Sequence, residues 1–132
     1  MVAKKMKNIY IVIMQKNEDG YYVDIPDFNT GTQGADLIEA MAMARDAIGI
    51  LGIDAEDDGE PIPEPGTLIR ALVDDEFTVL IDVDFVQYRK DNDNKSVRKN
   101  CTIPYWLSVE ADKAHINYSK VLQNALVKEL EI

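Results

Sequence analysis

Cysteine, histidine and long apolar segments are all scarce in this sequence, and each shortage excludes a class of protein. Cys101 is the only cysteine among 132 residues, so no disulfide forms within the chain, as expected in a reducing cytoplasm. The apolar run at 9–14 is far shorter than the roughly 20 residues that span a bilayer. The basic start before it lacks the cleavage site of a signal peptide. The composition therefore predicts a globular, cytoplasmic protein with no membrane segment.

Residues that carry enzyme chemistry are equally sparse. The chain has no phosphate-binding glycine loop, no paired cysteines and no dinucleotide-binding glycine pattern. The only histidine, His115, lies in a predicted turn without a Ser or Cys nucleophile pattern around it, which indicates a turn residue and not a general base. Cys101 alternates with Ile103, which predicts a small core residue and not a reactive thiol. We therefore expect a protein that is not an enzyme and holds no cofactor or metal.

One catalytic interpretation stays open as an alternative. Asp24, Asp82 and Asp84 lie on predicted strands, and nucleases that use two metal ions gather carboxylates on a sheet. The same positions are also the solvent side of alternating strands, where Asp is common in an acidic protein. No histidine ligand is near them in the sequence. We favour the second interpretation and keep a metal-dependent nuclease of ribonuclease-H-like type as the alternative.

Positive charge is outweighed by negative charge in the first part of the chain and exceeds it in the last part. Residues 1–94 hold 8 Lys and Arg against 20 Asp and Glu, a formal balance of −12. Residues 95–132 hold 6 basic and 4 acidic residues, a balance of +2. An acidic surface repels nucleic acid and suits a cationic protein partner. Only the basic end is electrostatically suited to DNA or RNA.

The first part of the chain predicts a small sheet with one helix. Strands are expected at 9–14 and 21–25, joined by a turn at 17–20, with a third extended segment at 30–34. Asp36 and Glu39 form a capping-box pattern that starts a helix, and Gly52 is expected to end it. Its predicted core stripe is Leu37, Met41, Ala44, Ile48 and Leu51.

An acidic, proline-containing loop at 54–66 is expected to separate this helix from a last strand at 78–86. The order is β-β-β-α-β in an α+β domain over residues 1–88. Residues 89–96 contain nothing apolar and are predicted to be a linker.

Residues 97–132 differ in kind. A short strand at 97–103 ends at Pro104, and two helices follow, the second capped by Asn117. A strand and two helices of this size bury too little apolar surface to fold alone, and a lone strand leaves its backbone groups unpaired. Both deficits disappear if two copies pair their strands and interlock their helices. The sequence therefore predicts an obligate homodimer through this segment.

The same segment carries the candidate DNA contacts. Period-two alternation places Arg98, Asn100 and Thr102 on one face of the strand, opposite Cys101 and Ile103. Two-stranded ribbons fit the major groove, where Arg and Asn contact base edges. Three further residues open the second helix, where free N–H groups suit a phosphate: Asn117, Tyr118 and Ser119.

At this point the sequence resembles a known family, the HicB antitoxins of type II toxin–antitoxin pairs. The likeness covers roughly residues 7–88 and rests on an ordered set of motifs: Gly20-Tyr21-Tyr22-Val23-Asp24-Ile25-Pro26-Asp27-Phe28, Thr32-Gln33-Gly34, Leu37, Glu39-Ala40, Ala44-Arg45-Asp46-Ala47 and Ile62-Pro63-Glu64-Pro65. The resemblance implies a partial ribonuclease-H-like layer without nuclease activity.

The tail looks like the ribbon-helix-helix version of the HicB C-terminus, from Thr102-Ile103-Pro104-Tyr105-Trp106-Leu107 through Ile116-Asn117-Tyr118-Ser119-Lys120-Val121-Leu122. Carrying over the base-facing positions of that ribbon gives Arg98, Asn100 and Thr102 again.

The resemblance implies an antitoxin that binds a HicA-like toxin, a small basic ribonuclease that degrades messenger RNA, and that represses its own operon by binding operator DNA. It does not assign toxin-binding residues. A dimeric interaction adaptor that never contacts DNA is the other alternative.

Overall fold

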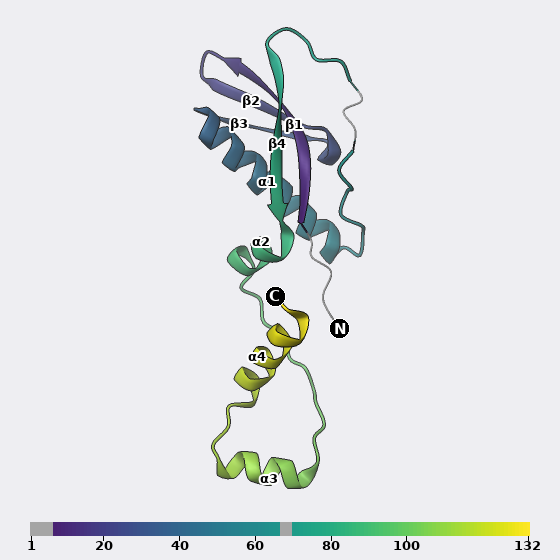
Figure 1. Cartoon of the computed structure of the whole chain (residues 1–132), viewed down its shortest axis with the longest axis vertical. Helices are drawn as coiled ribbons and strands as arrows, with labels where there is room; N and C mark the ends of the chain where they lie inside the picture. The colour runs from purple at the N-terminus through teal and green to yellow at the C-terminus, as the bar shows by residue number, and fades with distance from the viewer. Residues whose placement is uncertain (1–6, 67–69) are drawn as a thin grey trace. The chain divides into compact units, whose positions relative to one another are not determined.

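The computed structural model describes residues 7–66 and 70–132, so the first six residues of the basic start lie outside the described residues. Contacts divide the described chain between Asn94 and Lys95 into two compact units, which we call the body and the tail. The body contains the sheet and two α-helices, and the tail contains two further helices (Figure 1). Among the described residues, no helix is long and apolar enough to cross a membrane.

The body is built on a four-stranded antiparallel sheet. Its strands are β1 (Lys7–Asn17), β2 (Gly20–Ile25), β3 (Thr30–Gly34) and β4 (Glu76–Asp84), in the spatial order β3-β2-β1-β4. Asn17 pairs with Gly20 at the β1–β2 hairpin, where Gly20 takes φ +142°, a conformation that favours glycine. The hairpin and the third strand confirm the predictions.

Helix α1 (Leu37–Asp57) covers one face of this sheet. It starts as predicted, because the side chain of Asp36 accepts a hydrogen bond from the N–H of Glu39 at 2.8 Å. Ala44 and Ile48 of the predicted stripe are fully buried against the sheet, whereas Leu37 is 40% exposed. The core consists of alternate strand residues and this helix face: Tyr10, Val12, Met14, Val23, Ile25, Ala40, Ala44, Ile48, Ile81, Val83 and Phe85.

Helix α1 does not end at Gly52, and the last strand ends earlier than predicted. After Asp84 the chain turns into helix α2 (Phe85–Asn92), whose first residue is buried. A Cβ at Gly52 would lie 2.2 Å from the ring of Phe85, so the glycine is needed for close packing and not as a helix stop. Helix α2 thus takes in Phe85 and Val86, predicted as strand, and Arg89–Asn92, predicted as linker.

The tail contains helices α3 (Tyr105–Lys113) and α4 (Tyr118–Leu130), and neither buries a single residue. His115 lies in the turn between them with φ +56°, which confirms its prediction as a turn residue. Residues 97–103 form no strand hydrogen bonds within this single chain. The mixed α+β class is confirmed, while the ribonuclease-H-like and ribbon-helix-helix details stay predictions.

Candidate functional site

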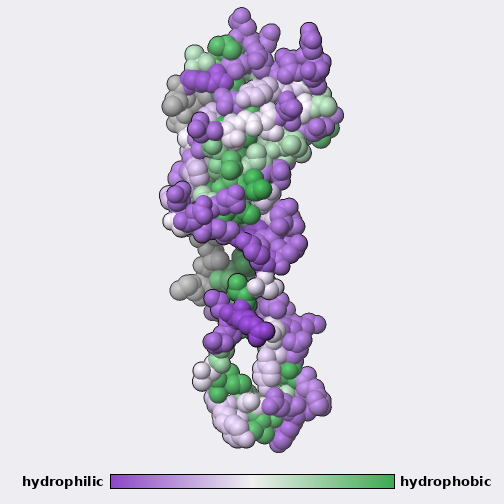
Figure 2. Space-filling view, turned by 180° about the vertical axis from the view of Figure 1, so that it is seen from behind, coloured by the Kyte–Doolittle hydropathy of each residue, from purple (hydrophilic) through white to green (hydrophobic). Residues whose placement is uncertain are grey.

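The tail presents an unusual density of exposed apolar side chains. Trp106 is 66% exposed, Val121 52% and Leu126 48%. Such residues normally form the interior of a helical unit, and Figure 2 shows apolar side chains at the surface of this part of the chain. The tail therefore has the side chains of a core but, as a single chain, no core.

A groove of about 530 Å³ runs between the extended segment before Pro104 and helix α4. Its lining includes Lys99, Cys101 and Ile103 from the segment, together with Tyr118, Ser119, Val121, Leu122 and Ala125. Cys101 is exposed in the single chain, so the prediction of a core residue is wrong for one copy alone. The alternation is nevertheless present, since every second residue of the segment faces the groove.

Arg98, Asn100 and Thr102, the predicted base-contacting residues, occupy the other positions of this alternation. All three are exposed, and none lines the groove between the segment and α4. Arg98 and Asn100 border a second groove of about 790 Å³, farther toward the start of the segment. All three side chains thus lie at the surface of the tail, but Arg98 and Asn100 line the second groove together with Leu122 and Leu126 of α4, whereas Thr102 lines neither groove.

The three residues that open α4 have different surroundings. Asn117 caps the helix, since its side chain accepts from the N–H of Lys120 at 3.1 Å. The hydroxyl of Tyr118 donates to the carboxylate of Asp112, and this bond raises the pKa of Tyr118. Ser119 borders both grooves. Tyr118 therefore joins α4 to α3 within the tail.

The carboxylates considered for a nuclease do not form a cluster. Asp24 and Asp82 lie on strands on opposite sides of β1, opposite Ile13 and Ile9 respectively. Strand spacing separates them by roughly 10 Å across the sheet, and four residues along β1 add about 13 Å. Carboxylates that share two metal ions must reach ions about 4 Å apart. Within the part of the chain that the structure describes, no three His, Cys, Asp or Glu residues could hold one ion.

Each of these carboxylates instead has its own structural partner. Asp82 pairs with Arg45 at 3.0 Å, and this contact lowers the pKa of Asp82. Asp84 caps helix α2 through the N–H of Gln87 and also pairs with Lys7 at 3.8 Å. The three side chains therefore stabilise the body in three separate places.

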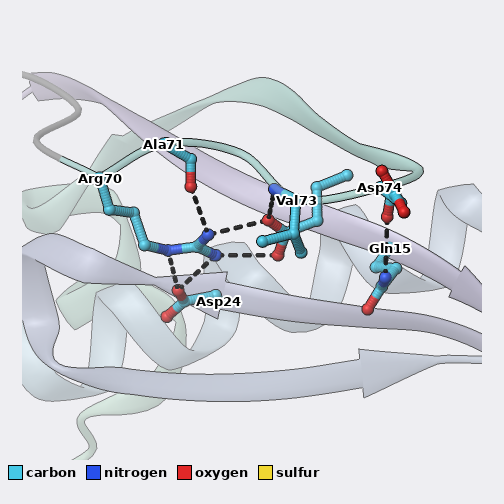
Figure 3. Close-up of polar contacts among 7 residues, drawn as sticks. Gln15, Asp24, Arg70, Ala71, Val73 and Asp74 are labelled. Carbon is cyan, nitrogen blue, oxygen red and sulfur yellow. Dashed lines mark hydrogen bonds and ion pairs between the residues drawn. The ribbon is translucent and has the colours of Figure 1, made fainter.

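Asp24 belongs to a contact that the sequence did not predict, a bridge made by Arg70 (Figure 3). The guanidinium of Arg70 donates to Asp24 on β2 and, at 2.8 and 2.9 Å, to both carboxylate oxygens of Glu76 on β4. The bridge therefore crosses β1 on the sheet face opposite α1. Ile13 of β1 lies on that face and is only 1% exposed. The only sequence signal was the position of Arg70 as a lone cation between two acidic stretches.

A small antiparallel sheet with one covering helix and an apolar helical tail without a core define a two-part α+β protein, and comparisons with known proteins give its family. Residues 9–127 match the family described as HicB_like antitoxin of bacterial toxin-antitoxin system. The chain belongs to this HicB-like antitoxin family. No curated protein sequence gives a significant match.

Two solved structures have a similar fold over nearly the whole chain. One is described as a toxin–antitoxin complex from Streptococcus pneumoniae, with a TM-score of 0.59 and 22% identity, covering 94% of this chain and 99% of that chain. The other is the antitoxin HicB of Burkholderia pseudomallei, with a TM-score of 0.51 and 21% identity, covering 95% and 98%. At these identities the likeness concerns the fold.

Proposed function

We propose that this chain is the antitoxin of a toxin–antitoxin pair, acting in the cytoplasm through two surfaces. The acidic body masks a small cationic toxin that degrades messenger RNA. The tail dimerises with a second copy, pairs the two segments at 97–103 as a ribbon and binds operator DNA. The family match and the solved toxin–antitoxin complex with a similar fold support the first part.

The observation that carries the second part is the absence of any buried residue in α3 and α4. A second copy would cover the groove residues Cys101 and Ile103 and leave Arg98, Asn100 and Thr102 outside, where a ribbon contacts the major groove. The charge of the two units fits this division, since the tail is basic and the body strongly acidic.

Truncation after Asn94 tests the division of labour. The body has its own core, so the shortened chain is expected to bind and inhibit the toxin encoded beside it but to lose specific binding to its upstream DNA. Specific DNA binding by the shortened chain would contradict the proposal. Full-length protein that binds the toxin but no DNA would instead favour the adaptor alternative.

Arg98→Ala tests the direct contact. At fixed salt it is expected to weaken binding to the specific site by about 1–3 kcal/mol, because an arginine contact to a base edge is lost. Lys113→Ala is the matched control, since Lys113 carries the same charge in the tail but pairs with Glu110 at the end of α3. Equal losses of DNA affinity in the two variants in a binding titration would contradict a role of Arg98 in base recognition.

A further inference from the structure

The outward side of helix α1 carries two exposed apolar side chains, Met43 and Ile50, which we call the stripe. Met43 and Ile50 lie seven residues apart, two turns along the same side of the helix, and Ala47 between them is half-buried where it packs against the core. Met43 is 41% exposed and Ile50 47%, whereas the core side of the same helix is fully buried at Ala44 and Ile48. Figure 2 looks onto this side of the body and shows apolar residues along the helix between polar ones.

Acidic side chains without a cation surround this stripe. Glu39 and Asp54 belong to the same helix, and no ion pair or side-chain hydrogen bond joins either carboxylate to another described residue. Asp46 accepts only the neutral hydroxyl of Tyr88 at 2.8 Å. The outer side of α1 therefore combines apolar contact area with uncompensated negative charge.

A small polar pocket lies at the start of the same helix. This pocket has a volume of about 300 Å³ and lies between the β1–β2 hairpin and the first turn of α1. Two carboxylates and a ring line it, those of Asp19, Glu39 and Tyr21. A guanidinium fits this combination, because carboxylates accept its N–H donors and an aromatic ring packs against its plane.

A second exposed apolar region of the body lacks this charge. Ile9 and Leu80 are 57% and 63% exposed on the sheet face opposite α1. The carboxylates near them are already compensated, since Asp82 pairs with Arg45 and Asp84 with Lys7. The outer side of α1 therefore attracts a cationic partner by its field more than this part of the sheet face does.

We propose that the outer side of α1 is the docking surface for the cationic toxin, which rests on the proposed function. The stripe of Met43 and Ile50 receives the apolar centre of the partner's surface. The pocket of Asp19, Tyr21 and Glu39 receives an arginine side chain from it. Central apolar and arginine contacts of this kind dominate protein interfaces, while the surrounding charges speed encounter.

The test compares two full-length lysine variants. The double variant Met43→Lys, Ile50→Lys places positive charge on the stripe. The double variant Ile9→Lys, Leu80→Lys does the same on the sheet face. All four positions are exposed, so both variants are expected to melt close to the wild-type temperature. The probe is the basic protein encoded in the adjacent reading frame, titrated by calorimetry. We expect at least a tenfold loss of affinity for the α1 variant and less than a threefold change for the sheet variant.

A third variant, Glu39→Lys, tests the pocket and is expected to weaken the same binding at least fivefold. Wild-type affinity in both the stripe and pocket variants, or an equal loss in the sheet variant, would overturn the α1 surface while leaving the proposed function intact. Failure of the wild-type chain itself to bind the basic protein would contradict the proposed function instead. DNA binding serves as a further control, since the α1 variants are expected to keep it.

Discussion

At the scale of single residues, Arg70 shows how one cation organises an acidic body. Its guanidinium holds Asp24 and Glu76 together across β1, and the N–H of Val73 donates to the same Glu76 carboxylate at 2.7 Å. The side chain of Gln15 also donates to the carbonyl of Asp74. These bonds fasten the segment 70–76 over the sheet face that α1 leaves open (Figure 3).

Acidification is expected to weaken this bridge. Hydrogen bonds from Arg70 and from the N–H of Val73 lower the pKa of Glu76 to about 2, from an ordinary value of 4.5. A carboxylate whose folded-state pKa is lowered contributes stability above its unfolded-state pKa and loses it as pH falls through the folded-state value. The contribution should therefore be complete at neutral pH and disappear between about pH 4.5 and pH 2.

Chemical denaturation of Arg70→Met and wild type across this pH range measures the effect. We expect the variant to be less stable at pH 7, with a difference that shrinks as the pH falls toward 2. Lys16→Met, which removes an exposed cation at the end of β1, is the control and should show little difference at any pH. A constant deficit of the Arg70 variant at all pH values would contradict the role of the bridge.

Local sequence patterns predicted the features that depend on residues close together in the chain. They did not predict the contacts between residues far apart in the sequence. Asp36 and Glu39 are three residues apart, and their capping pattern correctly gave the start of α1. Gly52 also looks like a local signal, yet its role depends on Phe85, more than thirty residues later. Arg70 meets Asp24 across a similar separation, so no local pattern contained the bridge.

At the scale of elements, the extended segment before Pro104 is the informative part of the tail. The alternation of its side chains between two faces was predictable, because it requires only an extended backbone. The groove lined by Lys99, Cys101 and Ile103 agrees with this alternation. The strand itself needs hydrogen-bond partners, and one chain supplies none to residues 97–103. The proposed ribbon assigns those partners to the second copy.

Cys101 offers a direct measurement of this ribbon. It is exposed in the single chain but lies on the groove face, which the proposed dimer covers. We expect alkylation of native dimer to be at least tenfold slower than alkylation of the unfolded chain. Dilution below the dimer's dissociation constant should restore the fast rate.

A moved cysteine supplies the control for this measurement. In a Cys101→Ala, Thr102→Cys double variant the thiol lies on the opposite face, so it should stay reactive in the dimer. Equal protection of the two positions, or fast alkylation of Cys101 in a sample whose solution mass is that of a dimer, would contradict the assigned faces.

At the scale of the whole molecule, the two units obtain their stability in different ways. The body has a closed core between α1 and the sheet, with Tyr10 at 0% exposure packed edge-on against Phe28 and Phe85. In the proposed dimer the tail takes its core from a second chain, so its folding is coupled to association. The two units are thus expected to unfold separately.

Trp106 makes this separation measurable, because it is the only tryptophan of the chain and lies in the tail. Since association stabilises only the tail, its fluorescence melting midpoint should rise with concentration, by roughly 5–10 °C for each tenfold increase in a unit of this size. The circular-dichroism transition of the chain truncated after Asn94, which keeps the body core alone, should not move with concentration. A single transition, independent of concentration, in the full chain would show that the tail is stable as a monomer, and the dimeric ribbon would then lose its physical basis.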